Sequence, residues 1–578
     1  MSKQWTLRRR PSSQNDSTVK WSECAPGLTQ FRGYQRAWLR GDVLAGVTVA
    51  AYLVPQVMAY ATVAGLEPVA GLWAALAPLA VYAVLGSSRQ LSVGPESTTS
   101  LMTASPLAPI VAGDPARYAA LAALLALLVG GICLFGGFIG LGFLANLLSK
   151  PVLVGYMTGV AFVMIGSQLG KLTKVKVSGD EFLDYVRSFI AGMSAVHWPT
   201  VVLSMSVLAL LLVLDRVVPR APVALIGVLA ATAVVTVFSL DEHGIAVIGQ
   251  IPAGLPAPGL PQVAMHDLAA LLLPSVGVAI VAFSDNVLTA RSFASRHHQE
   301  IDANAELRAL GVSNAAAGLT NGFPVSSSGS RTALGDAVGS RTQLYSLITL
   351  LSVLAVMLFA RGVLASFPMA ALGALVVYAA LRLIDVPGFK RLARFRRSEF
   401  ILAIATTVAV LGIGVLYGVL VAVGLSILEL LRRVAHAHDG ILGFVPGIAG
   451  MHDIDDYPEA KPVPGLVVYR YDAPLCFANA EDFRERALAA VEESPTPVEW
   501  FVLNSEANVE VDLTALDALD QLRAELAQRG IVFVMARVKQ DLRDALRAAG
   551  LIDKIGEDRI FMTLPTAVES YRGDRDPP

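Results

Sequence analysis

The sequence predicts an all-α polytopic membrane domain followed by a small cytosolic α/β domain. Only 16% of its 578 residues are charged, and the mean hydropathy is +0.58. Soluble proteins carry charges on about a quarter of their residues. Charged residues are sparse between Gly41 and about Leu431 and dense toward both ends. Beyond Gly465, short apolar runs alternate with amphipathic stretches at the spacing of strands and helices. The chain therefore joins two classes of structure.

The membrane segments are predicted from apolar stretches, because a helix needs about 20 apolar residues to cross the hydrocarbon core. The clear candidates are roughly 43–62, 68–87, 117–138, 151–170, 199–215, 222–239, 268–290, 344–360 and 366–384. The run 400–431 has room for two short helices, with Gly412 and Gly414 near its middle. Two Ser/Thr/Gly/Pro-rich regions near 95–111 and 324–340, and a weakly apolar helix around 304–321, bring the count to about fourteen.

The positions of basic residues predict the orientation, since cytoplasmic loops are rich in Lys and Arg. With the N-terminal segment 1–40 inside, the loops after even-numbered helices are basic, as at Arg89, Arg341 and Arg382. The loops after odd-numbered helices are acidic, as at Glu67. An even number of helices with both termini cytoplasmic follows, in a plasma (inner) membrane.

The C-terminal part is predicted as an α/β domain on a partly parallel sheet. Its expected strands begin at Leu466, Trp500 and Ile531, and its expected helices run roughly 480–491, 513–528 and 539–549. It has no transmembrane stretch, so it is expected in the cytosol. The chain is accordingly divided into an N-terminal cytosolic segment (1–40), a transmembrane domain (41–432), a linker (433–464) and a cytosolic domain (465–578).

A weak internal repeat appears when the chain is shifted by about 230 residues. Gly46–Tyr52 resembles Gly277–Phe283, and Val93–Thr98 falls near Gly322–Ser327. Two seven-helix halves of inverted topology follow, because seven is odd. Transporters of that build point the N-termini of Gly/Pro-interrupted half-helices at the substrate. Each N-terminus supplies about half a positive charge and unpaired N–H groups, so the repeat predicts a small-anion site. The alternative is that these Ser/Gly/Pro clusters are ordinary loops or close helix contacts.

Ionisable residues within the membrane are costly and usually functional. Arg331 follows Ser326–Ser330 at the start of the second half-helix, and its planar guanidinium suits an oxyanion. Glu96 opens the first half-helix, and Asp285 lies within an apolar run. Three alternatives stay open. Asp285 and Arg331 could form a structural ion pair, Glu96 could merely cap its helix, and Gln56 could hydrogen-bond a neighbouring helix.

Several sequence motifs are more specific than composition. They are Val54–Ala61, Gly94-Pro95, Asn304–Gly311 with Asn314, Ser328–Ala333 and Gly339–Thr342. These segments resemble the SulP (sulfate permease, solute carrier 26) family of anion transporters, and the C-terminal end resembles a STAS domain. The resemblance covers nearly the whole chain and is strongest to actinobacterial members described as sulfate transporters.

The resemblance implies fourteen segments in a seven-plus-seven inverted repeat with core and gate domains, and an anion held between helices three and ten. It implies substrate-binding roles for Gln56, Tyr60, Ser97, Ser330 and Arg331. Glu96, Thr98 and Ser328, at the starts of the two half-helices, are further substrate-binding candidates. The resemblance places Asp285 where relatives have the acidic residue linked to sodium or proton coupling. Glu96 departs from the small or apolar residue of many relatives and is a second coupling candidate. A homodimer through the STAS domain and the last helix is also implied.

The leading hypothesis is secondary active transport of sulfate across the plasma membrane by alternating access. If Glu96 and Asp285 both ionise, Arg331 leaves the site with one net negative charge before a dianion enters. A low-dielectric pocket resists that charge, so proton symport is expected. The alternatives are bicarbonate or a dicarboxylate as cargo, with sodium or protons as coupling ion, and a non-transporting membrane anchor for the STAS domain.

Other activities are not expected. An enzyme is not expected, and ATP is not expected to drive transport, because the sequence has no Walker-type loop. Three widely spaced cysteines offer neither a metal site nor a disulfide framework, and no cofactor is expected. His297 and His298 are interpreted as solvated. The net charge of -2 argues against a nucleic-acid partner. In the STAS-like domain Asp512 is followed by Leu513 instead of a phosphorylatable serine, so a phosphorylation switch is not expected.

Overall fold

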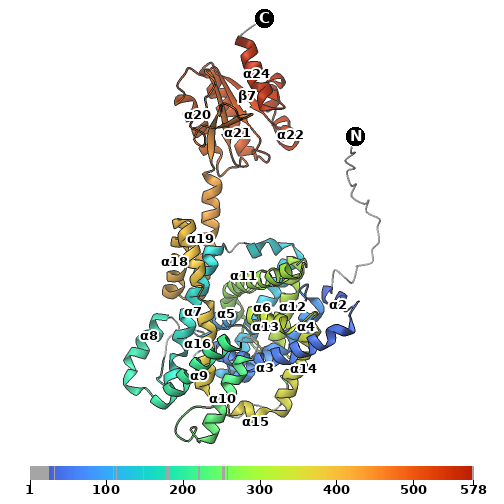
Figure 1. Cartoon of the computed structure of the whole chain (residues 1–578), viewed down its shortest axis with the longest axis vertical. Coiled ribbons are helices and arrows are strands. Elements are labelled where there is room, and N and C mark those ends of the chain that lie inside the picture. The colour runs from blue at the N-terminus through green and yellow to red at the C-terminus, as the bar shows by residue number, and fades with distance from the viewer. Residues whose placement is uncertain are drawn as a thin grey trace. The chain divides into compact units, whose positions relative to one another are not determined.

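The computed structural model describes residues 25–575 apart from 32, 109, 112–113, 147–148, 178–181, 219–221, 250–253 and 257. Most of the predicted N-terminal segment, residues 1–24, therefore lies outside the described residues. The chain divides into two compact units, one reaching to Ser426 and the other starting at Ile427. In its described residues the first unit is helical apart from one pair of short strands, and the second contains a six-stranded sheet (Figure 1).

The helices predicted from apolar stretches are present in the first unit close to their expected bounds, and short helices at 26–29, 182–191, 361–365 and 386–395 were not predicted. The helices of this unit are α2 (Pro26–Thr29), α3 (Leu39–Val63), α4 (Pro68–Leu85), α5 (Ser97–Leu107), α6 (Pro115–Phe138), α7 (Lys150–Thr173), α8 (Phe182–Ala191), α9 (Trp198–Val217), α10 (Val223–Val237), α11 (Met265–Arg296), α12 (Ala303–Leu319), α13 (Gly329–Val338), α14 (Leu344–Phe359), α15 (Arg361–Ala365), α16 (Met369–Leu383), α17 (Val386–Phe395), α18 (Arg397–Ile413) and α19 (Val415–Ala435). Short 3-10 turns lie at η1 (Arg36–Trp38), η2 (Leu141–Asn146) and η3 (Met193–Ala195). Gly414, with a φ of +83°, separates α18 from α19, which confirms two helices in the run 400–431.

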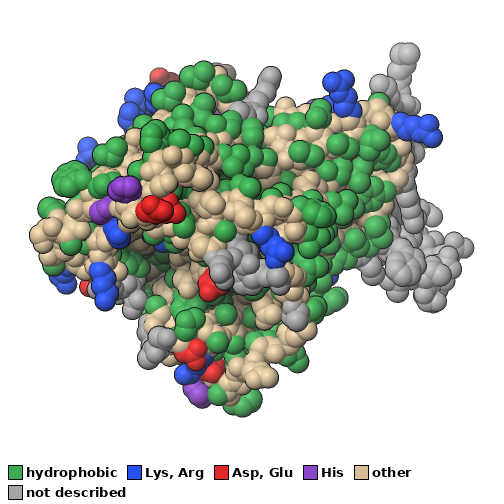
Figure 2. Space-filling view, turned by 90° about the horizontal axis from the view of Figure 1, so that it is seen from below, with side chains coloured by type: hydrophobic (Ala, Val, Ile, Leu, Met, Phe, Trp, Pro, Cys, Tyr) green, Lys and Arg blue, Asp and Glu red, His purple; other side chains and the backbone are tan. Residues whose placement is uncertain are grey.

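Seven helical spans among the described residues are long and apolar enough to cross a membrane. They are Arg36–Val63, Pro68–Leu85, Pro115–Phe138, Lys150–Thr173, Trp198–Val217, Met265–Arg296 and Met369–Phe395. Helices α10 and α14 are apolar but shorter. Large apolar side chains remain exposed on these helices, including Trp198, Val237 and Phe359. Figure 2 shows apolar side chains over much of the visible face, with charged side chains in small groups. Such a surface suits lipid, since soluble monomers rarely expose large apolar patches.

Two short helices begin where the sequence predicts broken segments. Strand β1 (Val93–Gly94) pairs antiparallel with β2 (Ser326–Ser327), and α5 and α13 start just after these strands. Glu96 caps α5 by accepting the Thr98 N–H at 2.7 Å, and Ser328 caps α13 by accepting the Arg331 N–H at 3.4 Å. The strand pair therefore brings two helix N-termini together, although they are more than 200 residues apart in the sequence.

Close helix contacts depend on glycine. A Cβ at Gly130 of α6 would lie 2.7 Å from the Ala315 backbone nitrogen of α12, and one at Gly311 would lie 2.8 Å from the Leu134 nitrogen. Small residues allow helix backbones to approach in a membrane, where packing replaces the hydrophobic driving force. Helices α4, α6, α11 and α12 form one packed group, and α7, α9, α16 and α18 form another (Figure 1).

Glu306 explains why α12 is weakly apolar by hydropathy. Its carboxylate is fully buried and accepts hydrogen bonds from Tyr82 Oη at 2.9 Å, from both the N–H and Oγ of Ser87, and from Asn286 Nδ2 at 2.7 Å. A buried carboxylate is tolerated when such donors replace its hydration. These hydrogen bonds to Glu306 therefore link α12 to α11 and to the C-terminal end of α4.

The second unit is an α/β domain whose strands lie in the order β4-β3-β5-β6-β7-β8. Its strands are β3 (Asp439–Phe444), β4 (Met451–Asp453), β5 (Leu466–Tyr471), β6 (Trp500–Asn504), β7 (Val532–Ala536) and β8 (Ile560–Phe561). Its helices are α20 (Ala480–Glu492), α21 (Leu513–Gln528), α22 (Gln540–Ala548), α23 (Leu551–Ile555) and α24 (Leu564–Arg575), with a 3-10 turn η4 (Glu557–Arg559). Strands β5 to β8 are parallel and β3 is antiparallel to both neighbours, so the partly parallel sheet is confirmed. The prediction missed β3, β4, β8, α23 and α24, because these are short or lie in polar stretches.

Candidate functional site

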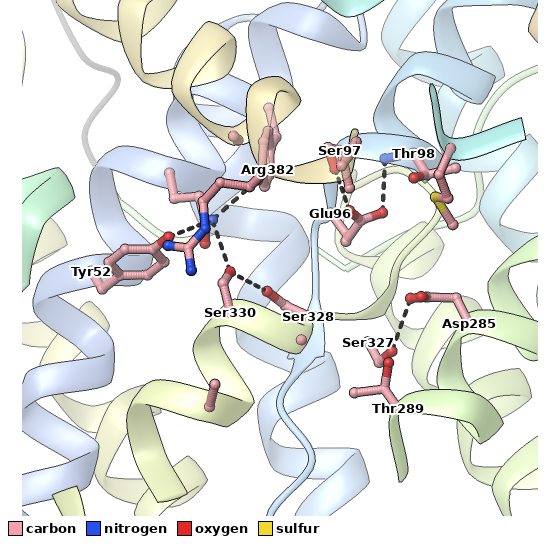
Figure 3. A pocket seen from close by; sticks show the side chains of 17 residues that line it. Tyr52, Glu96, Ser97, Thr98, Asp285, Thr289, Ser327, Ser328, Ser330 and Arg382 are labelled. Carbon is pink, nitrogen blue, oxygen red and sulfur yellow. Dashed lines mark hydrogen bonds between the residues drawn. The ribbon is translucent and has the colours of Figure 1, made fainter. Parts of the chain in front are cut away.

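A cavity of about 310 Å³ lies in the first unit, where α3, α7, α11 and α16 meet the starts of α5 and α13. This volume is at the lower end of the roughly 300–1,000 Å³ typical of ligand pockets. Its lining residues are Tyr52, Gln56, Tyr60, Glu96, Ser97, Thr98, Met157, Asp285, Thr289, Ser327–Ser330, Ala333, Ala379, Arg382 and Leu383. Figure 3 shows the hydroxyl and carboxyl groups of this set converging from separate helices.

Most of the predicted binding residues line this cavity. Gln56, Tyr60, Glu96, Ser97, Thr98, Ser328, Ser330 and the predicted coupling residue Asp285 are all in its wall. They come together because the β1–β2 pair joins the starts of α5 and α13, while α3 and α11 pass beside them. The sequence did not single out Tyr52, Thr289 or Ser327, which also line the cavity.

Arg331 departs from its predicted place. It is fully buried and does not line the cavity. Its Nη1 donates to Gln56 Oε1 at 3.1 Å and to the Pro95 carbonyl at 2.8 Å, and its Nε donates to Ser92 Oγ at 3.3 Å. The structure therefore places Arg331 behind the cavity wall, and its direct contact with substrate stays a prediction. Its Nη1 and Nε donate to oxygens behind the wall, whereas its Nη2 is buried without a hydrogen-bond partner among the described residues.

Arg331 determines which end of Gln56 faces the cavity. Because Gln56 Oε1 accepts from Arg331, its Nε2 is turned toward Tyr60 Oη at 3.1 Å, Tyr52 Oη at 3.5 Å and Ser330 Oγ at 3.5 Å. The amide therefore presents a donor on the cavity side. Gln56 both joins helices and lines the cavity, so the two interpretations left open by the sequence do not exclude each other.

The two carboxylates in the wall have different surroundings. Glu96 accepts from the Thr98 N–H and from Ser97 Oγ, so it does cap its helix, and it lines the cavity as well. Asp285 accepts from Ser327 Oγ at 3.0 Å and from Ser326 Oγ at 3.4 Å. Figure 3 shows Asp285 and Thr289 on the same helix, near Ser327. Within the described residues Asp285 and Arg331 form no ion pair, so that alternative is wrong.

Arg382 is the cavity residue that the sequence interpretation misplaced. The sequence analysis assigns Arg382 to a basic cytoplasmic loop, but the residue lies in the last turn of α16 and lines the cavity. Its Nη1 donates to Tyr378 Oη at 2.8 Å and to Asp215 Oδ1 at 3.1 Å. Helical spacing could have indicated this position from the sequence, since Arg382 falls inside the predicted helix 366–384, four residues after Tyr378.

The site therefore holds more positive charge than the sequence count allowed. Glu96 and Asp285 contribute two carboxyl groups, and Arg331 and Arg382 contribute two guanidinium groups. Asp215 shares the charge of Arg382 from outside the wall. The helix N-termini of α5 and α13 add fixed partial positive charge and donors. An oxyanion would meet hydroxyls, an amide donor and a guanidinium in one cavity.

The structure also describes His297, Asp512 and the residues considered as metal ligands. No group of three or more His, Cys, Asp or Glu in the described ranges could hold a metal ion. His297 is not simply solvated, because its Nε2 lies 2.7 Å from Asp336 Oδ1. In the second unit Asp512 caps α21 by accepting the Ala515 N–H at 2.8 Å, and it also accepts from the Phe477 N–H at 2.7 Å. Asp512 thus has a structural role directly before Leu513, which stands in place of a phosphorylatable serine.

Comparison with known proteins gives consistent matches. The sequence model of the sulfate permease family matches residues 39–406, and that of the STAS domain matches residues 457–567. A probable sulfate transporter of Mycobacterium tuberculosis (strain H37Rv) is 72% identical over 548 residues, which cover 95% of this chain and 98% of the relative. Probable sulfate transporter 4.2 of Arabidopsis thaliana is 32% identical, over 98% of this chain and 85% of the relative.

Two solved structures share the fold. Murine Solute Carrier 26 family member A9, an anion transporter in the inward-facing state, matches with a TM-score of 0.88 and 22% identity, over 98% of this chain and 97% of that chain. The transmembrane domain of a cyanobacterium bicarbonate transporter, BicA, matches with a TM-score of 0.60 and 23% identity, over 68% of this chain and 98% of that chain. At these identities the likeness concerns the fold alone.

Proposed function

The chain belongs to the sulfate permease family, and on that premise we propose that it carries sulfate across the plasma membrane by secondary active, proton-coupled transport with alternating access. Membership places it among transporters, not enzymes, and its apolar helices make it a multi-pass membrane protein. The single observation that carries the proposal is the cavity at the starts of α5 and α13, lined by hydroxyls, Gln56 and Arg382.

The chemistry of this cavity favours a tetrahedral oxyanion. Ser97, Ser330 and Tyr60 offer hydroxyl donors, and Gln56 offers Nε2 because Arg331 holds its oxygen. Arg382 adds a mobile positive charge from α16, which belongs to the packed group formed by α7, α9, α16 and α18. Alternating access in this proposal is a movement of that group against α3, α5, α11 and α13, which changes the distance from Arg382 to the anion.

The proposed membrane architecture has fourteen segments. They are α3 to α7, α9 and α10 in the first half, and α11 to α14, α16, α18 and α19 in the second. The pairing of β1 with β2 supports an inverted repeat, because these strands precede the corresponding short helices of the two halves. The division into residues 1–40, 41–432, 433–464 and 465–578 is a further part of this proposal, with the segment 433–464 supplying β3 and β4 to the sheet of the second unit. Cytoplasmic termini, core and gate domains, and a homodimer through the STAS domain and last helix also belong to the proposal.

Proton coupling rests on the charges around the cavity. With Glu96 and Asp285 ionised, Arg331 and Arg382 balance them, and sulfate then adds two negative charges to a low-dielectric site. Protonation of Asp285 or Glu96 offsets part of that charge. Asp285 is the better candidate, because the Glu96 carboxylate already caps α5 through the Thr98 N–H, whereas Asp285 accepts only from the hydroxyls of Ser326 and Ser327.

A second candidate is bicarbonate or dicarboxylate transport, coupled to sodium. The observation in its favour is the group of oxygens around Asp285, since Ser327 and Thr289 also line the cavity and hard cations prefer oxygen ligands. A membrane anchor without transport is not favoured, because the cavity is lined with polar groups that such an anchor does not need.

Uptake of labelled sulfate into proteoliposomes tests the proposal. Ala333→Trp fills the cavity, whereas Ala337→Trp places the same side chain one turn later on α13, outside the cavity wall. We expect Ala333→Trp to abolish uptake and Ala337→Trp to retain it. Equal uptake by both variants would assign transport to another path.

The coupling is tested with an imposed pH gradient, with and without sodium. We expect an inward proton gradient to accelerate sulfate uptake by the wild type, and Asp285→Asn to remove that acceleration. Uptake that does not depend on the pH gradient refutes proton coupling, and uptake that requires sodium supports the sodium coupling of the second candidate. Competition by bicarbonate and dicarboxylates then decides the cargo.

A further inference from the structure

A second polar cavity, of about 380 Å³, lies at the ends of several helices of the first unit. Ala37 and Trp38 of η1 and Gly41 of α3 form one side. The remaining lining residues are Arg89 and Gln90 after α4, His297 and Gln299 after α11, and Gly339 and Arg341 after α13. It shares no lining residue with the cavity that contains Asp285.

Two unpaired guanidiniums face this second cavity. In the described part of the chain, the side chains of Arg89 and Arg341 have no hydrogen-bond or ion-pair partner. Two carboxylates on the same segments, Asp42 and Asp336, are already engaged. Asp42 is fully buried and accepts from the N–H groups of Arg341 and Thr342 and from the Thr342 hydroxyl, and Asp336 contacts His297. No Asp or Glu is among the described residues that line the cavity, so its lining carries net positive charge.

Gln90 gives an independent sign of a missing ligand. It is only 2% exposed, and its Oε1 has no hydrogen-bond partner among the described residues. A buried amide without a partner costs free energy. Rotation about its last side-chain bond exchanges oxygen for nitrogen, so the same amide can accept from or donate to a ligand. A group that carries acceptor oxygens and a hydroxyl satisfies both Gln90 and the two arginines.

We propose that this second cavity binds a phosphate group. Planar guanidiniums match phosphate oxygens with two parallel hydrogen bonds, and two of them neutralise its charge. The surroundings favour a phospholipid as the source. Leu39, Val43 and Val47 repeat every four residues on α3 and are 47%, 39% and 52% exposed, so an apolar stripe leads away from the cavity. Trp38 in the cavity wall is the residue type that favours a membrane interface. The proposal does not depend on the transported anion.

Three probes separate the possible sources of the phosphate. Binding to the full-length protein in detergent is measured with dioctanoyl phosphatidic acid, with dioctanoylglycerol and with glycerol phosphate. The first has phosphate and acyl chains, the second lacks phosphate, and the third lacks acyl chains. We expect phosphatidic acid to bind at least about tenfold more tightly than dioctanoylglycerol, since each charge-assisted hydrogen bond contributes about that factor. Glycerol phosphate binding as tightly as phosphatidic acid identifies a soluble phosphate as the ligand.

Substitutions connect the binding to this cavity. Arg89→Gln with Arg341→Gln should weaken phosphatidic acid binding at least about tenfold. Arg391→Gln with Arg394→Gln removes two exposed charges of α17 outside the cavity and should change binding less than about twofold, because exposed charges contribute little. If the first pair does not fold, Ala37→Glu puts a carboxylate beside the arginines from an exposed position and should weaken binding equally. Binding that needs no phosphate, or that survives these cavity substitutions, overturns the proposal.

Discussion

Replacing Asp215 by Asn tests whether Arg382 contributes its charge to the transported anion. Arg382 Nη1 lies 3.1 Å from Asp215 Oδ1, and Arg382 lines the cavity while Asp215 does not. Asp215 therefore competes with an anion for the same guanidinium. Removing the competing carboxylate should strengthen sulfate binding, which is the opposite of what loss of a purely structural ion pair would do.

The magnitude follows from the distance and the exposure. At 3.1 Å, Coulomb's law with an effective dielectric constant of about 20 gives an upper bound of about 5 kcal/mol. The Arg382 and Asp215 side chains are 53% and 32% exposed, so solvent screens the pair. Exposed ion pairs contribute about 0.2–1 kcal/mol, which corresponds to a roughly 1.4- to 5-fold lower KM for sulfate in Asp215→Asn.

Removing Arg382 itself should have a larger effect of opposite sign. A hydrogen bond to a charged group contributes about 1.5–3 kcal/mol, so Arg382→Gln should raise the KM for sulfate roughly 10- to 150-fold. The assay is the initial rate of labelled sulfate uptake into proteoliposomes over a range of sulfate concentrations, with sulfate binding measured by calorimetry as a check on KM.

The double variant provides the control. In the Arg382→Gln background, Asp215→Asn has no guanidinium to release, so it should leave KM unchanged. A higher KM in the single Asp215→Asn variant, or the same shift with and without Arg382, would refute the competition. Either result would make the pair a structural link between α9 and α16.

Three further predictions concern other contacts. Arg331→Lys keeps the charge but loses the planar group whose Nη1 and Nε reach Gln56 Oε1 and Ser92 Oγ at the same time; sulfate uptake should fall at least about tenfold, since the single ammonium of lysine does not replace a guanidinium that donates from two nitrogens, and wild-type uptake by this variant would contradict the positioning role. Gly130→Ala should destabilise the protein by about 1–3 kcal/mol because its Cβ meets the α12 backbone, whereas Gly131→Ala, which has open space, should not; thermal unfolding in detergent compares the two. Burial acts against the ionised form of Asp520, but hydrogen bonds from Lys554 and Arg523 hold its pKa below the ordinary value. Its stabilisation is therefore present above the unfolded pKa and lost as pH falls through the lower folded pKa, so the difference in urea stability between wild type and Asp520→Asn should shrink with acidification, and a difference that grows would contradict the assignment.

Helix positions were predictable because they depend on local composition. Long apolar runs require helices in lipid, since every backbone polar group must be satisfied within the segment. The starts of α5 and α13 were also predictable from the sequence. Pro95 and the Ser326–Gly329 segment interrupt apolar runs, and residues that cap helices lie at these interruptions. The same local rules located β5 and α21 in the second unit.

The direction in which a side chain points depends on partners far away in the chain. Arg331 lies behind the cavity wall because its Nη1 donates to the Pro95 carbonyl and to Gln56 Oε1, whose residues are more than 200 positions earlier in the chain. Arg382 enters the cavity because α16 packs beside α3 and α9, a contact that no periodicity encodes.

The sequence by itself thus determined that this chain has a membrane domain with two broken segments, a separate α/β domain and the residue types of an anion site, since hydropathy, capping and motif spacing are local properties. Only the tertiary structure decided which of those residues form the cavity wall, which stand behind it, and that Arg382 joins them. The physical reason is that hydrogen-bond partners of buried polar groups are chosen by the packing of distant helices, and a buried donor takes whichever acceptor that packing brings within reach.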